Sequence, residues 1–433
     1  MSEIVFPSSR PVTRTKLNRS QITGFWAAWA GWTLDGMDSV IYALVLSPAL
    51  NELLPKSGIK ATPATVGYAG SVLFALFLVG WGLSLIWGPI ADRFGRTRVL
   101  AATIFVYAFF TGAAALSQSV WQLAVFRLLA GVGIGGEWAL AGTYVAEAWP
   151  EDRRKMGAGY LQTGYYAGFF LASALNFTVG ARYGWRAMFW CGLTPIILTF
   201  IILRRVKEPE RWQRKARAHS LRHHPLLAIF SGQYLRRTTI NTVLLASAIC
   251  GLWAGAVYAP TALIGLAKRA GMVQAQAVKT SSFGMGLLSL GTILGCLCVP
   301  LLAERIGRKR TLAFYFAGMG GCILLSFGWA FYLAQGLTTF IVVLFFLGFF
   351  GGNFAVFSLW LPEQYDTSVR ATAFAFTTSF GRFIAAGVNF VIAGLVSRTG
   401  TLGRPVAITA IGFGIGLLVI PFAAETKGTT LPD

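Results

Sequence analysis

Five ionisable side chains lie deep inside long apolar stretches of this 433-residue chain. Asp35 and Asp38 occupy the first stretch, Arg127 and Glu137 share a later one, and Arg382 lies in the last but one. A charged group in such a stretch costs about 3 kcal/mol or more unless it is paired or hydrated. These five residues are therefore the first candidates for function.

The three carboxylates have the chemistry of proton carriers. Asp35 and Asp38 are three residues apart, which places them on one side of a helix. A carboxylate in a cavity of low polarity can bind a proton and release it when access changes sides. We therefore predict a proton-coupling role for Asp35, Asp38 and Glu137. All three histidines lie in the polar segment near residue 220, so an intramembrane histidine is excluded as proton carrier.

The two arginines keep their charge and need an anionic partner, which is either a protein carboxylate or a carboxylate of the substrate. Both are candidates for substrate binding, and a structural ion pair is the alternative for each. Aromatic and amide side chains in the apolar stretches complete the predicted substrate-binding set: Arg382, Arg127, Asn353, Asn389, Trp32, Tyr42 and Trp138.

The elements that must position these residues are membrane-spanning helices. Hydrophobic residues make up 55% of the chain and charged residues 12%, and apolar runs of spanning length recur throughout. We predict an all-α integral membrane protein with twelve spans, near residues 22–48, 66–90, 98–117, 121–147, 157–181, 186–205, 239–267, 280–303, 310–333, 338–361, 371–397 and 404–424.

A short basic motif occurs twice, at an offset of 212 residues, as Gly88-Pro-Ile-Ala-Asp92-Arg93-Phe-Gly95-Arg96 and Pro300-Leu-Leu-Ala-Glu304-Arg305-Ile-Gly307-Arg308. A second pair of matches has an offset of 216 residues: Glu147 with Arg154, and Glu363 with Arg370. This period indicates a duplicated unit of six helices. The motif residues are candidates for a gate that is broken and remade, and the first copy is expected to be the stronger because Pro300 and Glu304 depart from it.

The duplication predicts five parts: an N-terminal tail (1–21), an N-terminal six-helix bundle (22–205), a linker (206–238), a C-terminal six-helix bundle (239–424) and a tail (425–433). In this topology 26 of the 37 Lys and Arg residues lie on the side of the termini and nine on the other. Basic loops stay in the cytoplasm. Both termini are therefore expected there, in a plasma (inner) membrane protein whose first span is retained. Topology and anionic lipid account for the +21 charge, so no nucleic-acid partner is expected.

Several other activities find no support in the residue patterns. The five cysteines are scattered in apolar spans, without a disulfide or metal pattern. The glycines between Gly131 and Gly136 follow no strand, so close helix packing is favoured over a nucleotide loop. No phosphate-binding loop, nucleophile constellation or metal cluster is present. We predict neither an enzyme nor a cofactor, with protons as the coupling ion.

The paired motifs, the twelve spans and the closing Glu425-Thr-Lys-Gly428 resemble the major facilitator superfamily across the whole chain. The segment Asp35-Gly36-Met37-Asp38 is similar to aromatic acid/proton symporters. The stretches around it and from Gly136 to Pro150 resemble sialic acid/proton symporters. The resemblance implies two bundles that rock around a central site and inward symport of an organic acid with protons. Residues 206–237 are too polar and short for the additional central spans of sialic acid transporters.

We therefore expect a monomeric secondary active transporter in the bilayer that imports a small organic acid anion, such as an aromatic acid, a sugar acid or a sialate-like compound. A proton-coupled sugar or metabolite transporter and a drug or metabolite exporter are the alternatives within the same fold. A receptor without transport is a third class. Arg382 favours an anionic substrate over a cationic one.

Overall fold

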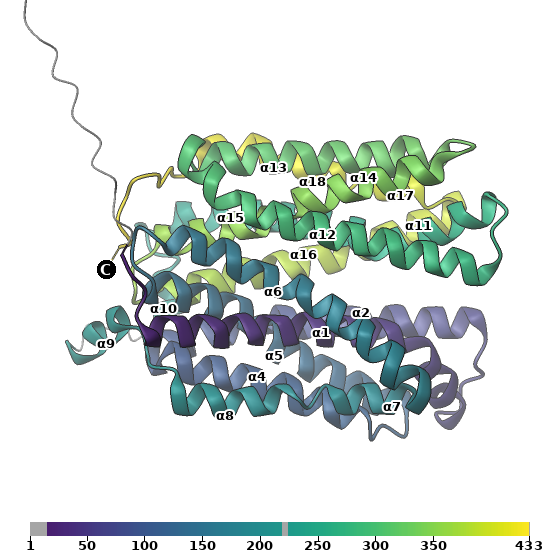
Figure 1. Ribbon diagram of the computed structural model, residues 1–433, viewed down its shortest axis with the longest axis horizontal. Helices are drawn as coiled ribbons and strands as arrows, with labels where there is room; N and C mark the ends of the chain where they lie inside the picture. Colours follow the sequence, from purple (N-terminus) through teal and green to yellow (C-terminus); the bar gives the residue numbers. More distant parts are fainter. Residues whose placement is uncertain (1–14, 219–223, 433) are drawn as a thin grey trace, which may run out of the picture.

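The computed structural model describes residues 15–218 and 224–432. The side chains at positions 63, 64, 67, 71, 181, 252–257, 274, 275, 278, 389, 390, 393 and 397 lie outside this description. The described chain is helical and forms two six-helix bundles that lie side by side (Figure 1). This confirms the predicted all-α, twelve-span architecture.

The first bundle consists of six spans, three of which change helix type or break. Its elements are α1 (Arg19–Lys56), α2 (Pro63–Leu83), η1 (Ser84–Ile86), α3 (Trp87–Phe94), α4 (Arg96–Ala114), α5 (Val120–Ala148), α6 (Arg154–Leu175), η2 (Asn176–Gly180), α7 (Ala181–Cys191) and α8 (Pro195–Arg205). The linker carries α9 (Glu210–Arg217) and α10 (Pro225–Ala228).

The second bundle repeats this plan. Its elements are α11 (Leu235–Arg269), α12 (Gln274–Ile306), α13 (Arg308–Ile323), η3 (Leu324–Trp329), η4 (Ala330–Tyr332), α14 (Gly336–Gly351), α15 (Asn353–Trp360), η5 (Pro362–Gln364), α16 (Arg370–Thr399), α17 (Gly403–Ala407), α18 (Ala410–Val419) and η6 (Ile420–Phe422). Among the described residues, nine of the twelve helical segments are long and apolar enough on their own to cross a membrane. The other three are α6 with η2, α11 and α16.

Local sequence explains where the helices start. Asn18 and Gln21 form a reciprocal capping box at the start of α1, and Thr62 and Thr65 form another at α2. Because of its cap, α1 begins at Arg19 and then runs to Lys56, well past the predicted end at residue 48. The predicted sixth span is two helices, α7 and α8, separated by residues 192–194.

The glycine run of α5 brings helices into close contact. An ideal Cβ on Gly131 would lie 2.4 Å from the carbonyl oxygen of Phe77 in α2. On Gly133 it would lie 2.5 Å from the backbone nitrogen of Tyr107 in α4. These distances leave no room for a side chain, so the run serves packing, as predicted.

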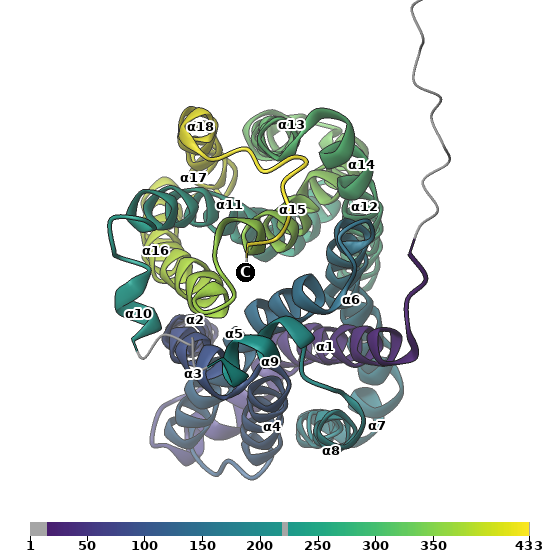
Figure 2. The ribbon, with the colours of Figure 1, turned by 90° about the vertical axis from the view of Figure 1, so that its left-hand side faces the viewer.

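The bundles meet along α2, η1, α3, α5 and α6 on one side and α12, α15 and α16 on the other. The linker helices and both ends of the described chain lie at one end of the molecule, which we name the linker end (Figures 1 and 2). Thr15 contacts Asp152 there, and Leu431 contacts Glu151. An even number of spans follows from this arrangement.

Candidate functional site

The three predicted proton carriers lie in the first bundle, Asp35 and Asp38 on α1 and Glu137 on α5, and all three are fully buried. Asp38 has a basic neighbour, because its Oδ2 lies 3.6 Å from Nη1 of Arg127. Asp35 and Glu137 have no hydrogen-bond partner among the described residues.

Asp35 and Glu137 belong to one cluster. An ideal Cβ on Gly31 would lie only 2.1 Å from Oε1 of Glu137, so this carboxyl group rests against α1. Gly31 is one helical turn before Asp35, on the same face. The charges of Glu137, Asp38 and Arg382 all act on Asp35. The structure thus brings the three acids together, and we name them the acidic cluster.

Arg382 approaches this cluster from the second bundle, on α16. Its guanidinium carbon lies 4.2 Å from the ring centroid of Trp81 and 5.9 Å from that of Trp138, both in the first bundle. Its Nη1 is buried without a hydrogen-bond partner, and within the described chain no carboxylate reaches ion-pair distance from it. The guanidinium is therefore a buried cation whose charge is free to receive an anion.

Arg127 has a different environment. Its guanidinium carbon lies 3.9 Å from the Tyr42 ring centroid and 4.4 Å from that of Phe77, inside the first bundle. With Asp38 beside it, Arg127 realises the alternative of pairing with a protein carboxylate. The Tyr42 hydroxyl is buried and unpartnered in the described structure. Substrate contacts for Arg127 and Tyr42 stay predictions.

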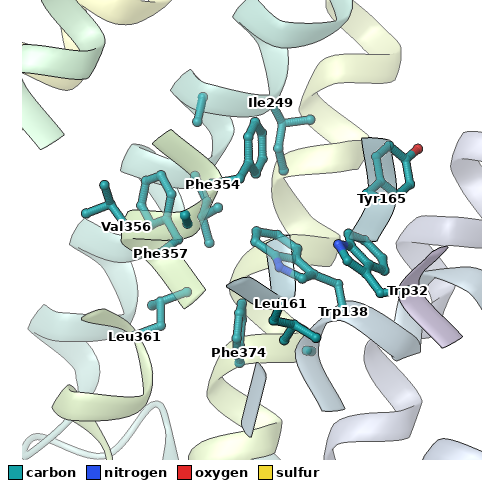
Figure 3. Packing of buried hydrophobic residues seen from close by; sticks show 14 of the residues in the cluster. Trp32, Trp138, Leu161, Tyr165, Ile249, Phe354, Val356, Phe357, Leu361 and Phe374 are labelled. Atoms are coloured by element: carbon teal, nitrogen blue, oxygen red, sulfur yellow. The ribbon is translucent and has the colours of Figure 1, made fainter. Parts of the chain in front are cut away.

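Aromatic rings fill the space between the bundles beside Arg382 (Figure 3). The Trp138 ring lies 6.2 Å from the nearly parallel Trp32 ring, 5.5 Å from Phe354 and 5.2 Å from Phe374. Trp32 in turn contacts Tyr165 at 4.8 Å. Trp138 and Trp32 come from the first bundle and Phe354 and Phe374 from the second. We name these five residues the aromatic cluster.

Polar contacts fix the aromatic cluster. Trp138 Nε1 donates to Oγ of Ser358 in α15 at 3.0 Å, which joins the two bundles at mid-depth. Asn353, the first residue of α15, donates to the Phe350 carbonyl at 3.0 Å, while its own Oδ1 is buried without a partner. The predicted substrate contact Asn389 lies on α16, but its side chain is outside the described residues.

The first copy of the repeated motif joins the bundles at the linker end. Asp92 accepts hydrogen bonds from the backbone nitrogens of Ala371 (3.3 Å) and Thr372 (2.8 Å) at the start of α16. Gly88 permits this contact, since an ideal Cβ there would lie 2.6 Å from Cα of Thr372. Asp92 thereby caps a helix of the opposite bundle.

Two buried ion clusters lie beside this contact. In the first cluster, Glu147 accepts two hydrogen bonds of 3.0 Å from Arg96 of its own bundle and one of 2.7 Å from Arg370 of the other. Arg96 also donates to the Thr367 carbonyl of the second bundle at 2.6 Å and pairs with Asp92 at 3.0 Å.

The second ion cluster has the same plan with the bundles exchanged. Glu363 accepts from Arg308 of its own bundle at 2.7 and 2.9 Å and from Arg154 of the other at 2.9 Å. The two glutamates at an offset of 216 residues therefore occupy equivalent places. Each one joins an arginine of its own bundle to an arginine of the opposite bundle.

The remaining motif residues lie at the periphery. Arg93 and Arg305 are exposed, and Glu304 forms an ion pair with Lys155 near the surface. Gly95 (φ +109°) and Gly307 (φ +88°) join α3 to α4 and α12 to α13, in backbone conformations that glycine adopts readily.

Sequence reasoning missed two carboxylates, Glu208 and Glu425. Glu208 accepts from the backbone nitrogens of residues 96, 97 and 98 at the start of α4, at 2.8 to 3.2 Å. Glu425 does the same for residues 308 and 309 at the start of α13, at 3.0 and 3.1 Å. Burial raises the pKa of Glu425, but backbone N–H donors outweigh burial and hold the pKa below its usual value. The signal was available, because each glutamate follows the last span of its half.

The C-terminal segment, residues 424–432, crosses the linker end between the bundles (Figure 2). Arg370 donates to the Pro432 carbonyl, and Arg211 of α9 donates to the Leu431 carbonyl at 3.0 Å. Leu431 also donates to Glu151 of the first bundle at 3.3 Å. Together with Trp212, which donates to the Asp92 carbonyl at 2.9 Å, these contacts cover the closed linker end.

Comparison with known proteins places this geometry in a family. The model of the Major Facilitator Superfamily matches residues 26–388. A probable 4-methylmuconolactone transporter of Cupriavidus pinatubonensis is 29% identical, over 94% of this chain and 92% of the relative. The 4-hydroxybenzoate transporter PcaK of Pseudomonas aeruginosa is 26% identical over 92% and 89%. The sialic acid transporter NanX of Escherichia coli is 27% identical over 68% of each chain.

Among solved structures, the proton:xylose symporter XylE bound to 6-bromo-6-deoxy-D-glucose superposes with a TM-score of 0.78 at 18% identity. The match covers 95% of this chain and 98% of that one. The relatives include the two groups that the first span resembles, and the matched proteins are transporters, so the predictions of family and of a transporter that is not an enzyme are confirmed.

Proposed function

The chain belongs to the Major Facilitator Superfamily, and from this premise we propose that it imports a small organic acid anion together with protons. It is a multi-pass membrane transporter. The names of its relatives support an organic acid as substrate, because they include transporters of 4-methylmuconolactone, 4-hydroxybenzoate and sialic acid. Aromatic acids and sugar acids fit the same description.

The observation that carries the proposal is the pairing of opposite charges left without partners at the middle of the interface. Arg382 offers a buried guanidinium from the second bundle, while Asp35 and Glu137 offer buried carboxylates from the first. A buried anion without a cation is costly, so each carboxylate gains by binding a proton. A substrate carboxylate then takes the guanidinium without competition from Asp35.

We assign the residues accordingly. Asp35 and Glu137 carry the coupled protons, and Asp38 joins them when its pair with Arg127 is broken. Arg382 binds the substrate carboxylate, and the aromatic cluster stacks on the rest of the substrate. Protons are the only coupling partner in this scheme, and no cofactor takes part.

Alternating access follows from the fold. The bundles of residues 22–205 and 239–424 rock against each other, and the linker end faces the cytoplasm of the inner membrane in accord with its excess of basic residues. The two ion clusters, Asp92 and the C-terminal segment hold that end closed, so they must separate to release substrate inward. The transporter acts as a monomer in the bilayer.

The test measures proton movement in proteoliposomes. The purified protein is reconstituted with a neutral lumen and an acidic outer buffer, and 4-hydroxybenzoate, a sugar acid and sialic acid are added in turn. We expect lumen acidification with at least one acid above that of empty liposomes, and its loss in Asp35→Asn. Glu210→Gln, an exposed carboxylate on α9, is the matched control and should acidify the lumen normally.

Two outcomes would contradict the proposal. Proton-driven accumulation retained in Asp35→Asn would remove Asp35 from coupling. A response only to neutral sugars or cationic drugs would make Arg382 a structural residue and favour the alternative transporter classes.

A further inference from the structure

The charge balance at the interface limits how many carboxylates a substrate can carry. Arg127 and Arg382 are the two basic residues within the spans at mid-depth. Arg127 lies 3.6 Å from Asp38 and is enclosed by Tyr42 and Phe77 of its own bundle. One cation, Arg382, remains for a substrate, with its Nη1 buried and unpartnered in the described structure.

The neighbours of Arg382 offer no second positive charge. On one side its guanidinium faces the rings of Trp81 and Trp138, and Trp138 packs against Phe354 and Phe374. Such rings accommodate a planar, conjugated group, but they provide no compensation for a negative charge.

On the other side lie Asp35 and Glu137, two buried carboxylates without partners among the described residues. A second substrate carboxylate placed here would be buried beside like charges. A buried charge left unpaired weakens binding by about a hundredfold or more.

We propose that the site accepts organic anions with a single carboxylate and rejects dicarboxylates, and that Arg382 is the residue that sets this limit. The inference rests on the proposed function and narrows it to ring-bearing or conjugated monocarboxylates. It assigns the carboxylate to Arg382 and the uncharged remainder to the aromatic cluster.

Three ligands of matched shape test the limit: terephthalate with two carboxylates, its monomethyl ester with one, and its dimethyl ester with none. Binding to the full chain in detergent is measured by isothermal titration calorimetry at neutral pH. We expect the monomethyl ester to bind about a hundredfold more tightly than terephthalate and the dimethyl ester. Equal affinity for terephthalate and the monoester would overturn the proposal.

Variants of Arg382 assign the preference to its charge. In Arg382→Gln the advantage of the monoester over the diester should fall to about one, whereas Arg382→Lys should keep part of it. An unchanged preference in Arg382→Gln would overturn the role of Arg382. If Arg382→Gln does not fold, the result with Arg382→Lys decides, because a change of cation geometry should still reduce monoester affinity.

The proposed function fails in a different way. If none of the three ligands binds while another acid drives lumen acidification in proteoliposomes, the monocarboxylate limit is overturned and proton symport stands. If no acid acidifies the lumen, the proposed function falls and the limit falls with it.

Discussion

Asp92 and Glu304 occupy the same position of a motif repeated 212 residues apart, yet their surroundings differ. Asp92 is buried, with 1% of its side chain exposed, and caps the first turn of α16 in the opposite bundle. Glu304 has 55% of its side chain exposed and pairs with the side chain of Lys155 at the start of α6. One additional methylene in an otherwise repeated motif thus accompanies a change from a backbone cap to a surface ion pair.

The packing beneath the two carboxylates explains the difference. Gly88 lets α3 approach the backbone of α16, whereas Pro300 replaces that glycine in the second copy. There the small residue lies on the opposite helix, because an ideal Cβ on Gly159 would lie 2.6 Å from Cγ of Pro300. The first contact joins backbone to backbone, and the second joins a proline ring to a helix. We therefore expect the first to contribute more to closure.

Glu147 offers the largest test of this asymmetry. Glu147→Gln leaves Arg96 and Arg370, both fully buried, without a carboxylate and should destabilise the closed protein by about 3 to 5 kcal/mol. Glu363→Gln should cost less, because Arg154 and Arg308 retain some exposure to water. Thermal unfolding in detergent measures both, and equal losses would contradict the asymmetry.

The two glycines provide the next test. Gly88→Ala places a methyl group against the backbone of α16 and should shift the protein away from the closed form by about 1 to 3 kcal/mol. Gly159→Ala meets a proline ring first and should cost less. The rate at which each variant releases preloaded substrate reports the shift. A larger effect at Gly159 would reverse the comparison.

The carboxylates themselves come third. Asp92→Asn removes the ionic part of the cap and of the pair with Arg96 and should weaken closure by about 1 to 2 kcal/mol, with a larger effect on turnover than on substrate affinity. Glu304→Gln should change turnover little, because exposed pairs contribute about 0 to 1 kcal/mol. Initial uptake rates at several substrate concentrations separate turnover from affinity, and unchanged turnover in Asp92→Asn would remove its gating role.

The smallest effect is expected at the cap of α13. Because the pKa of Glu425 is held below its usual value, the ionised form adds stability at neutral pH, and this contribution is lost as the pH falls through that lowered value. Glu425→Gln should therefore reduce stability at neutral pH by about 0.5 to 1 kcal/mol and remove part of the loss seen below pH 4. Unfolding midpoints at neutral and acidic pH check this, and an identical pH profile would contradict it.

Hydropathy and the internal repeat were sufficient to predict the twelve spans and the membership of the family. They could not predict the break between α7 and α8, because residues 192–194 lie within an apolar run. Nor could they predict that α1 continues to Lys56, since a helix that leaves the membrane loses its apolar signal.

The candidate site was predicted as residue types, and its pairings were not. The sequence identified Asp38 and Arg127, but which side chains meet depends on the rotation of α1 and α5 about their axes. The caps by Glu208 and Glu425 were missed for another reason: each connects a loop to a helix start more than a hundred residues away. Only the repeated spacing of the two glutamates pointed to them.

The path of the C-terminal segment makes it a natural position for an optical reporter. Leu431 is buried between Arg211 of the linker and Glu151 of the first bundle, so a fluorophore attached there would sit in a seam that exists in one conformation. Separation of the bundles at this end would expose the dye to water and change its emission. The five free cysteines of the chain would first be replaced to make the labelling specific. Each transport cycle would then be visible as a change of light intensity in a single molecule.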